Sequence, residues 1–296
     1  MPRTAPRTRP RTADGPTSPA LPARGAWSTR RFFLVLTLCV AAFVTLLPFL
    51  WMLSASLRTR GDLIGNPTTL WPGELTWDHY TAIWTQIPFG RQLLNTVIFA
   101  GTVAVVSVLF DSMAGYALAR FTFPGRTAVF ILVVATLMLP VQVTLIPIYN
   151  FLVDLHWVNT YQGLIVPRLA DAFGIFFMRQ YFLALPKDLE DAARIDGAGE
   201  LRIFRRVMFP LAVPAVLTIG LFNLLNNWND LLWPLVVTTQ TEMRTLPAGL
   251  ALFKGEHVTD YGLLMAGSVL ALLPMLVAFL AVQRRFIEGI ATTGLK

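Results

Sequence analysis

Long apolar stretches recur along the chain and alternate with shorter segments that hold most of the charged residues. A helix needs about 20 apolar residues to cross the hydrocarbon core of a bilayer, and a spanning segment must satisfy its backbone hydrogen bonds internally. Each long stretch is therefore predicted to be a helix. The pattern predicts an all-α polytopic membrane protein with about six transmembrane helices, at about residues 32–53, 93–119, 128–148, 162–183, 211–237 and 261–282.

Residues 1–31 precede the first apolar stretch and are rich in Pro, Arg, Thr and Ala. Such a composition buries too little apolar surface to offset the entropy of ordering, so a disordered basic cytoplasmic tail is predicted there. The small residues at 54–56 raise the alternative of a cleaved signal peptide. The apolar stretch 32–53 is longer than the roughly 7–15-residue core of such a peptide. An uncleaved first span is therefore favoured, followed by one transmembrane domain over 32–296.

The composition agrees with a membrane protein and predicts its orientation. Only 14% of the 296 residues are charged and 55% are hydrophobic, whereas a soluble domain carries about 25% charged residues. Of the 24 Lys and Arg residues, 17 lie on one predicted side of the membrane and five on the other. The positive-inside rule then places both termini in the cytoplasm. Contact with anionic membrane lipid accounts for the net charge of +7 without any role for nucleic acid.

The predicted cytoplasmic segment 185–210 reads LPKDLEDAARIDGAGELRIFRRVMFP. Two short helices are expected on either side of a glycine turn. Asp188 is predicted to cap the first helix, with Asp191 completing a capping box. Gly197 and Gly199 are predicted to end that helix in left-handed or closely packed backbone, and the second helix is predicted to begin near Glu200. Its apolar face would hold Leu201, Phe204, Val207 and Met208, and its basic face Arg202, Arg205 and Arg206.

An amphipathic basic helix is by itself typical of a membrane-surface segment, but this segment also resembles the EAA signature of ABC importer permeases. That signature is Glu-Ala-Ala, three residues, Gly, nine residues and then Ile-x-Leu-Pro. Here Asp191-Ala192-Ala193, Gly197 and the run from Val207 to Pro210 keep every spacing. Asp replaces Glu, and Val and Phe replace Ile and Leu. The segments AARIDGA, WND and QRRFIEGIATTGLK are also similar to sugar permeases of the maltose-permease type. This resemblance covers about residues 32–296.

The resemblance implies the type I ABC importer permease fold in a bacterial inner membrane, and it implies no cofactor, metal or catalytic residue. The implied partners are a second permease, a cytoplasmic dimer of ABC ATPases and an extracytoplasmic solute-binding protein. The chain itself holds no GxxxxGK[ST] loop that would cradle nucleotide phosphates, so ATP hydrolysis is expected in the partner. The residues expected to couple the loop to that ATPase are Asp191, Ala192, Ala193, Asp196, Gly197, Ala198, Phe204 and Pro210.

Several polar residues fall inside predicted spans, where an ionised side chain costs on the order of 3 kcal/mol. Arg168 and Asp171 are three residues apart and are predicted to pair, whereas Asp111 has no evident partner. In the fifth span, polar side chains recur at spacings of three, four and seven, which predicts one polar stripe. This stripe is either a substrate path or hydrogen-bonding contact with a partner permease. Its members are Asn223, Asn226, Asn227 and Asp230.

The resemblance favours the permease half of an importer for a sugar, oligosaccharide or polyol. One alternative is an ion-coupled secondary transporter, in which intramembrane carboxylates would carry the coupling ion. Another is an intramembrane enzyme, for which no HExxH or GxSxG motif is present. The identity of the sugar does not follow from the sequence.

Overall fold

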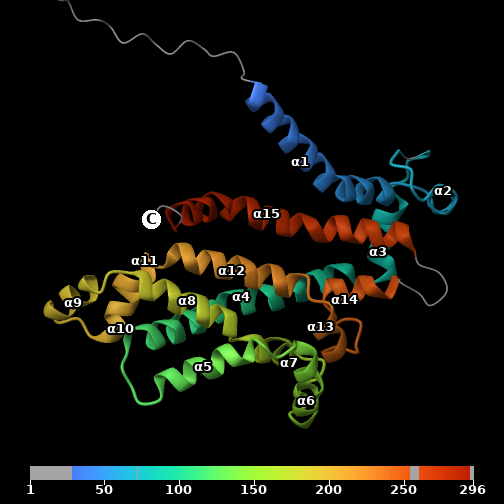
Figure 1. Cartoon of the computed structure of the whole chain (residues 1–296). Coiled ribbons are helices and arrows are strands. Elements are labelled where there is room, and N and C mark those ends of the chain that lie inside the picture. Colours follow the sequence, from blue (N-terminus) through green and yellow to red (C-terminus); the bar gives the residue numbers. More distant parts are fainter. Residues whose placement is uncertain (1–28, 72, 254–259, 294–296) are drawn as a thin grey trace, which may run out of the picture. The chain divides into compact units, whose positions relative to one another are not determined.

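The computed structural model describes residues 29–71, 73–253 and 260–293. The predicted tail therefore lies almost entirely outside the described residues. The chain divides into two compact units, Met1–Pro48 and Phe49–Lys296. Helix α1 (Thr29–Ser56) begins in the first unit and ends in the second, and the helices that follow belong to the second (Figure 1).

Three described helices are long and apolar enough to cross a membrane without interruption. They are α1 over Arg31–Ser56, α4 (Phe89–Arg120) and α15 (Tyr261–Thr293), whose qualifying part is Tyr261–Ala281. Two sharply bent helix pairs raise the number to five if each pair is one span. The first, second and sixth predicted spans are thus continuous helices.

The third and fourth predicted spans are interrupted. Helices α5 (Arg126–Thr136) and α6 (Val141–Asp154) meet at 100°, with Pro140 at the break. Next come α7 (Tyr161–Ile165), a 3₁₀ turn, η1 (Val166–Arg168), and α8 (Ala172–Ala184). The span predicted over 162–183 is therefore not one continuous helix, because Pro167 lacks the N–H that a continuing helix needs and Asp171 starts a new helix as its N-cap.

The fifth predicted span also divides. The segment before it contains α9 (Asp188–Ile195), α10 (Glu200–Ile203), a π-helical turn, η2 (Phe204–Met208), and α11 (Phe209–Leu211). A bend of 77° separates the run 200–211 from α12 (Val213–Trp228). A break over 229–231 then precedes α13 (Leu232–Val237).

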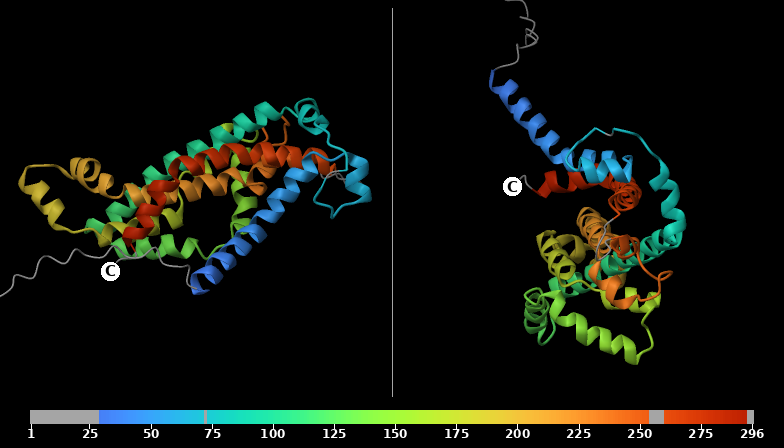
Figure 2. Two further views of the ribbon diagram at one scale, coloured as in Figure 1. Left: turned by 90° about the horizontal axis from the view of Figure 1, so that it is seen from above. Right: turned by 90° about the vertical axis from the view of Figure 1, so that its right-hand side faces the viewer.

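Shorter helices complete the chain: α2 (Arg60–Gly65), α3 (Asp78–Gln86), α14 (Leu246–Leu250) and a 3₁₀ turn, η3 (Ala251–Phe253). Within the described residues, the one β feature is an isolated bridge between Arg58 and Leu75. The views of Figure 2 agree with Figure 1 that α9 and α10 lie at one end of the second unit and α2 and α3 at the other.

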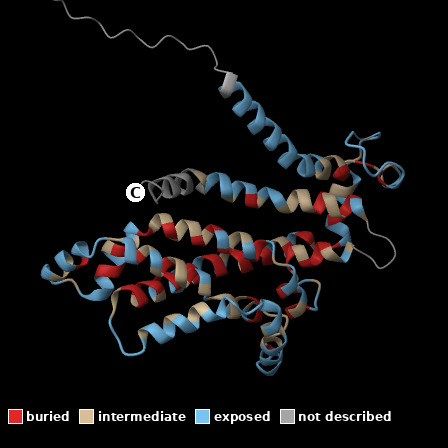
Figure 3. Ribbon diagram, viewed as in Figure 1, coloured by how far each residue is buried: buried red, intermediate tan, exposed pale blue. Residues whose placement is uncertain are grey.

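Helix α4 is the centre of the second unit, and buried positions follow it along most of its length (Figure 3). It packs most extensively against α8 and α12. A Cβ at Gly115 of α4 would lie 2.8 Å from both Arg179 N and Met178 Cβ of α8, so glycine permits this close helix contact. On the α12 side, Asn223 Nδ2 donates a 2.6 Å hydrogen bond to Ser107 Oγ of α4. These contacts make α4 and its two neighbours one packed group.

Candidate functional site

The helix that carries the Asp-Ala-Ala motif starts differently from its prediction. Lys187, rather than Asp188, is the N-cap residue of α9, and no side chain caps the helix. The predicted capping box is therefore wrong. Asp188, Glu190 and Asp191 lie in the first turn instead, where carboxylates interact favourably with the exposed backbone N–H groups.

The glycine turn after α9 has the hydrogen bonds of a Schellman motif. Gly197 N–H donates to Arg194 O and Ala198 N–H donates to Ala193 O, each at 3.0 Å. Gly197 has φ of +80°, the left-handed backbone that this motif requires and that a residue with a Cβ adopts at a cost. The sequence prediction is confirmed at this position. At Gly199 it is wrong, because φ is −72° and a Cβ would meet nothing within 4 Å.

The inner face of the loop packs onto the ends of α4 and α8. Ile203, Phe204 and Met208 are buried in a cluster with Tyr116 of α4 and Phe182 of α8. Leu201, predicted on this face, is 64% exposed, whereas Ile203, which was not predicted, is fully buried. Both residues belong to α10, ahead of the π-helical turn over 204–208, so their different exposure reflects which side of α10 faces the ends of α4 and α8.

Ionic contacts hold the same loop on its polar side. Arg120 Nε, at the end of α4, lies 2.7 Å from Glu190 Oε1, and both side chains are buried. Arg194 of α9 contacts Asp191 at 2.9 Å, Glu200 at 2.8 Å and Glu190 at 3.5 Å. Burial raises the pKa of Glu190 above its usual value, and the positive charges of Arg120 and Arg194 offset part of that rise.

The outer face of the loop exposes apolar side chains together with the motif. Ile195 is 87% exposed and stands two residues before the left-handed glycine, and Leu189 and Leu201 are exposed nearby in sequence. Of the predicted coupling residues, those exposed on the loop are Asp191, Ala192, Asp196, Gly197 and Pro210. Ala193 and Ala198 are half-buried, and Phe204 is buried. The predicted set therefore divides into an exposed group and an anchoring group.

Inside the membrane-spanning region, Arg168 pairs with a residue far away in sequence. Its Nη2 lies 2.6 Å from Asp230 Oδ2, and its guanidinium lies over the ring of Trp233 at 5.4 Å. The predicted pair of Arg168 with Asp171 is wrong. The helix breaks between them, and the Asp171 carboxylate instead accepts a hydrogen bond from Gly174 N–H as the N-cap of α8.

Asp111 of α4 also has a partner that the sequence did not reveal. Its Oδ1 accepts a 2.9 Å hydrogen bond from the backbone N–H of Asp171, and the side chain is fully buried. A Cβ at Gly174 would collide with the second carboxylate oxygen, so glycine is required where α8 passes Asp111. Asp111 therefore fixes the start of α8 against α4.

The predicted polar stripe contains both buried and exposed residues, and its last member lies beyond the helix. Asn223 and Asn227 are buried, and Asn227 donates a 2.8 Å hydrogen bond to the carbonyl of Asn223. Asn226 is exposed, and Asp230 lies beyond the end of α12, where it pairs with Arg168. The helix ends at Trp228, so the spacing of seven from Asn223 to Asp230 is not carried by one continuous helix.

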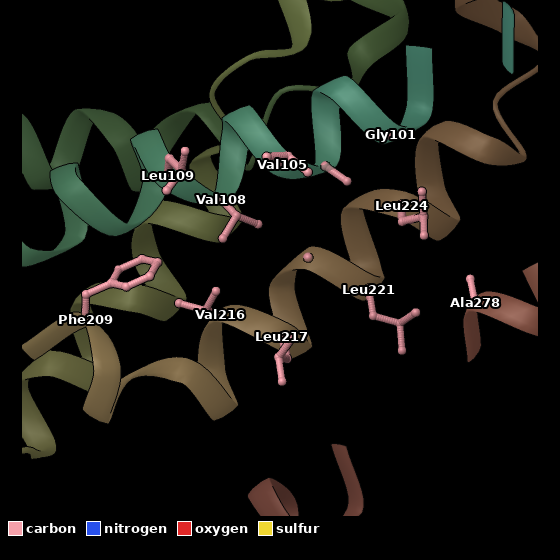
Figure 4. Close-up of a pocket in the computed structure, with 12 residues that line it drawn as sticks. Gly101, Val105, Val108, Leu109, Phe209, Val216, Leu217, Leu221, Leu224 and Ala278 are labelled. Carbon is pink, nitrogen blue, oxygen red and sulfur yellow. The ribbon is translucent and has the colours of Figure 1, made fainter. Parts of the chain in front are cut away.

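An apolar cavity lies elsewhere in the second unit. It has a volume of about 400 Å³ and lies between α4, α12 and α15 (Figure 4). Its walls are almost entirely apolar and contain none of the predicted path residues. They include the small residues Gly101, Ala104 and Gly220. This cavity offers no hydrogen-bonding groups from polar side chains to a sugar.

Comparison with known proteins places the chain in a family. Residues 111–291, more than half of the chain, match the model of the binding-protein-dependent transport system inner membrane component. The chain belongs to this family.

Relatives and a solved structure agree with that membership. The permease is 40% identical to the arabinooligosaccharides transport system permease protein AraQ of Halalkalibacterium halodurans, over 86% of this chain and 92% of that protein. It is 34% identical to the diacetylchitobiose uptake system permease protein NgcG of Streptomyces coelicolor, over 92% of each. A chain from a bacterial ABC transporter involved in the import of alginate shares the fold, with a TM-score of 0.75 and 25% identity over 88% of the permease and 99% of that chain.

Family membership supports a transport subunit of an inner membrane rather than an enzyme. It gives no support to the alternative of an ion-coupled secondary transporter, because the family depends on a binding protein. Sequence reasoning missed two charged residues of the permease that belong to the loop's anchoring, Arg120 and Glu190. The sequence places Arg120 at the end of a predicted span and Glu190 next to the Asp-Ala-Ala motif, but only the fold brings the two side chains together.

Proposed function

We propose that this permease forms, with a second permease, the translocation path of an importer for a carbohydrate: a sugar, oligosaccharide or polyol. The relatives support the substrate class, because they are named for arabinooligosaccharides and diacetylchitobiose, and the solved structure for alginate. A solute-binding protein would deliver the carbohydrate, and a cytoplasmic dimer of ATPases would supply the energy. Both termini of the permease would lie in the cytoplasm.

The observation that supports the coupling role is the arrangement of segment 185–210. Its outer face exposes Ile195 and Leu201 beside a left-handed turn at Gly197, while its inner face is fixed to α4 and α8. A rigid projection with exposed apolar tips suits insertion into a cleft of a partner protein. We infer that the loop docks on the ATPase, so that movement of the ATPase on nucleotide binding displaces the helices to which the loop is attached.

The substrate path is proposed at the helix breaks. Asn226 is exposed on α12, and Asp230 and Arg168 are both partly exposed at the breaks near the end of that helix. Amide and carboxylate groups hydrogen-bond to hydroxyl groups, so these residues suit brief contact with a carbohydrate. Asn223 and Asn227 would support the helix rather than touch substrate, because they are buried and hydrogen-bonded within the subunit.

The deciding experiment compares Gly197→Asp with Gly199→Ala in the complete complex reconstituted into liposomes. Gly197 needs left-handed backbone and Gly199 does not, so the second variant controls for the added side chain. We expect Gly197→Asp to lose ATPase docking, binding-protein-stimulated ATP hydrolysis and carbohydrate uptake together, because a Cβ there costs roughly 1–2 kcal/mol before any collision in the cleft. Gly199→Ala should keep them. Normal stimulation and uptake in Gly197→Asp, at equal amounts of assembled complex, would refute the coupling role.

A further inference from the structure

A buried ion pair joins the motif-bearing helix to the end of the central membrane-spanning helix. Arg120 is the last residue of α4, and Glu190 lies in the first turn of α9. Arg120 Nε lies 2.7 Å from Glu190 Oε1, and the side chains are only 9% and 1% exposed. The same guanidinium donates a 2.7 Å hydrogen bond from Nη2 to the carbonyl of Leu185. One arginine therefore holds both the start of the loop and its first helix.

The other ionic contacts of the loop are of a different kind. Arg194 contacts Asp191, Glu190 and Glu200, and all four residues lie within segment 185–210. These contacts shape the loop itself, and Asp191 and Glu200 are exposed to solvent. The contact between Arg120 and Glu190 instead crosses from the loop to α4, and it is screened from solvent. Among the described residues, the Arg120–Glu190 contact is the salt bridge that joins segment 185–210 to α4.

Helix α4 is rigidly attached to α8 at two levels. Gly115 lets the backbones approach so closely that a Cβ would lie 2.8 Å from Arg179 N. One turn further from the loop, Asp111 accepts the backbone N–H of Asp171 and fills the space above Gly174. A force applied at Arg120 therefore acts on the packed pair of α4 and α8, and α8 reaches the helix break next to Arg168.

We propose that the Arg120–Glu190 pair is the tie by which α4 and α8 follow the coupling loop when an ATPase displaces it. Both are positioning residues, and the proposal rests on the proposed docking of the loop. Apolar contacts also connect the loop to α4, through the cluster around Tyr116 and Phe204. The buried loop members of that cluster, Ile203, Phe204 and Met208, follow the glycine turn, whereas Glu190 lies before it in α9, so the ion pair holds α9 itself against the end of α4. Without the pair, α9 would move while the end of α4 lags behind.

The test measures whether the loop and the end of α4 move together. In a Cys39→Ser background, spin labels are attached at the exposed positions Thr122, two residues beyond α4, and Arg202 on the loop, through Thr122→Cys and Arg202→Cys. Their separation is measured by electron–electron resonance in the reconstituted complex, at rest and after trapping with ATP and vanadate. With the pair intact, the separation should be the same in both states. In Arg120→Ala and Glu190→Gln it should change on trapping, by on the order of 2–5 Å.

Matched variants separate a tie from a general structural role. Arg205→Ala removes an exposed arginine of the same loop and should leave the separation unchanged in both states. Arg120→Lys keeps the charge and should retain most of the joint movement.

In Arg120→Cys/Glu190→Cys without spin labels, a short bifunctional thiol reagent should restore ATP-driven uptake that the untreated variant has lost. The trial substrate is an arabinooligosaccharide or another carbohydrate that the purified binding protein of this system binds.

The outcomes distinguish this proposal from the docking on which it rests. If trapping leaves the separation unchanged in Arg120→Ala and Glu190→Gln as in the intact complex, the tie is refuted even though docking stands. Failure of the ATPase to co-purify with the wild-type permease would instead refute the docking. If Arg120→Ala does not assemble, Glu190→Gln decides, because the amide keeps the shape of the buried side chain and removes only its charge.

Discussion

The guanidinium of Arg168 lies 2.6 Å from Asp230 Oδ2, so an ion pair connects the two helix interruptions at 166–171 and 229–231. Asp230 Oδ1 also accepts a hydrogen bond from the backbone N–H of Trp233, which lies in the first turn of the next helix after the second break. The pair therefore neutralises two charges within the membrane-spanning region and holds the broken ends of two helices together.

Removing either partner should destabilise the permease more than removing both. Asp230→Ala or Arg168→Ala leaves one charge without its partner, at an expected cost of about 1–3 kcal/mol, because the pair is only partly buried. The double variant should lose less stability than either single variant, because it leaves no charge without its partner. Thermal unfolding of the purified complex measures all four proteins in one cycle. Additive losses would mean that the two residues act independently.

Asn226 and Asn223 should give opposite results although they lie on the same helix. Asn226→Ala should reduce carbohydrate uptake per assembled complex with little change in stability, because the side chain is exposed. Asn223→Ala should reduce stability by roughly 1–3 kcal/mol, since it removes the hydrogen bond to Ser107 of α4. Uptake and the thermal midpoint are measured for both. Normal uptake in Asn226→Ala would remove that residue from the proposed path.

Reporter fusions should follow the asymmetry of Lys and Arg between the two sides. Fusions at Gly125 and Gly199 should report a cytoplasmic position, and fusions at Gly73 and Gly255 an external one. Alkaline phosphatase activity measures external positions, and fluorescence of a cytoplasmic reporter measures internal ones. An external signal at Gly199 would contradict both the orientation and the docking of the loop on an ATPase.

The stability lost in Arg120→Ala should depend on pH. Burial raises the pKa of Glu190 above 4.5, and Arg120 counteracts part of that rise. Without Arg120 the folded-state pKa rises further, so the variant keeps its stability while Glu190 is protonated and loses it as the pH increases through the raised pKa. The difference in stability from wild type should thus be smallest at acidic pH and grow as the pH rises between the two folded-state pKa values of Glu190, by at most about 1.4 kcal/mol per pH unit. Glu190→Gln should remove most of this dependence.

Local sequence patterns predicted the features that depend on a few neighbouring residues. The apolar stretches located the helices, and the motif spacing located the loop and the left-handed position of Gly197. The Schellman motif involves only residues 193–198, so its geometry follows from local backbone hydrogen bonds.

Features that depend on long-range contacts were predicted wrongly or missed. Arg168 was expected to pair with Asp171 on a regular helix, but the helix breaks between them, and the partner lies 62 residues away. The inward position of Ile203 follows from how α10 packs against the ends of α4 and α8. The partners of Asp111 and Arg120 were likewise set by how α4 packs against segments later in the chain.

The bend of 77° between the run 200–211 and α12 makes this part of the chain a pair of helical arms that meet at an angle. Its first arm carries the inner face of the loop, and its second arm carries Asn226 and ends just before Asp230. Because the arms are close to perpendicular, a push along the first arm is mostly transverse to the second. A displacement of the loop along the first arm would therefore move α12 sideways rather than along its own axis.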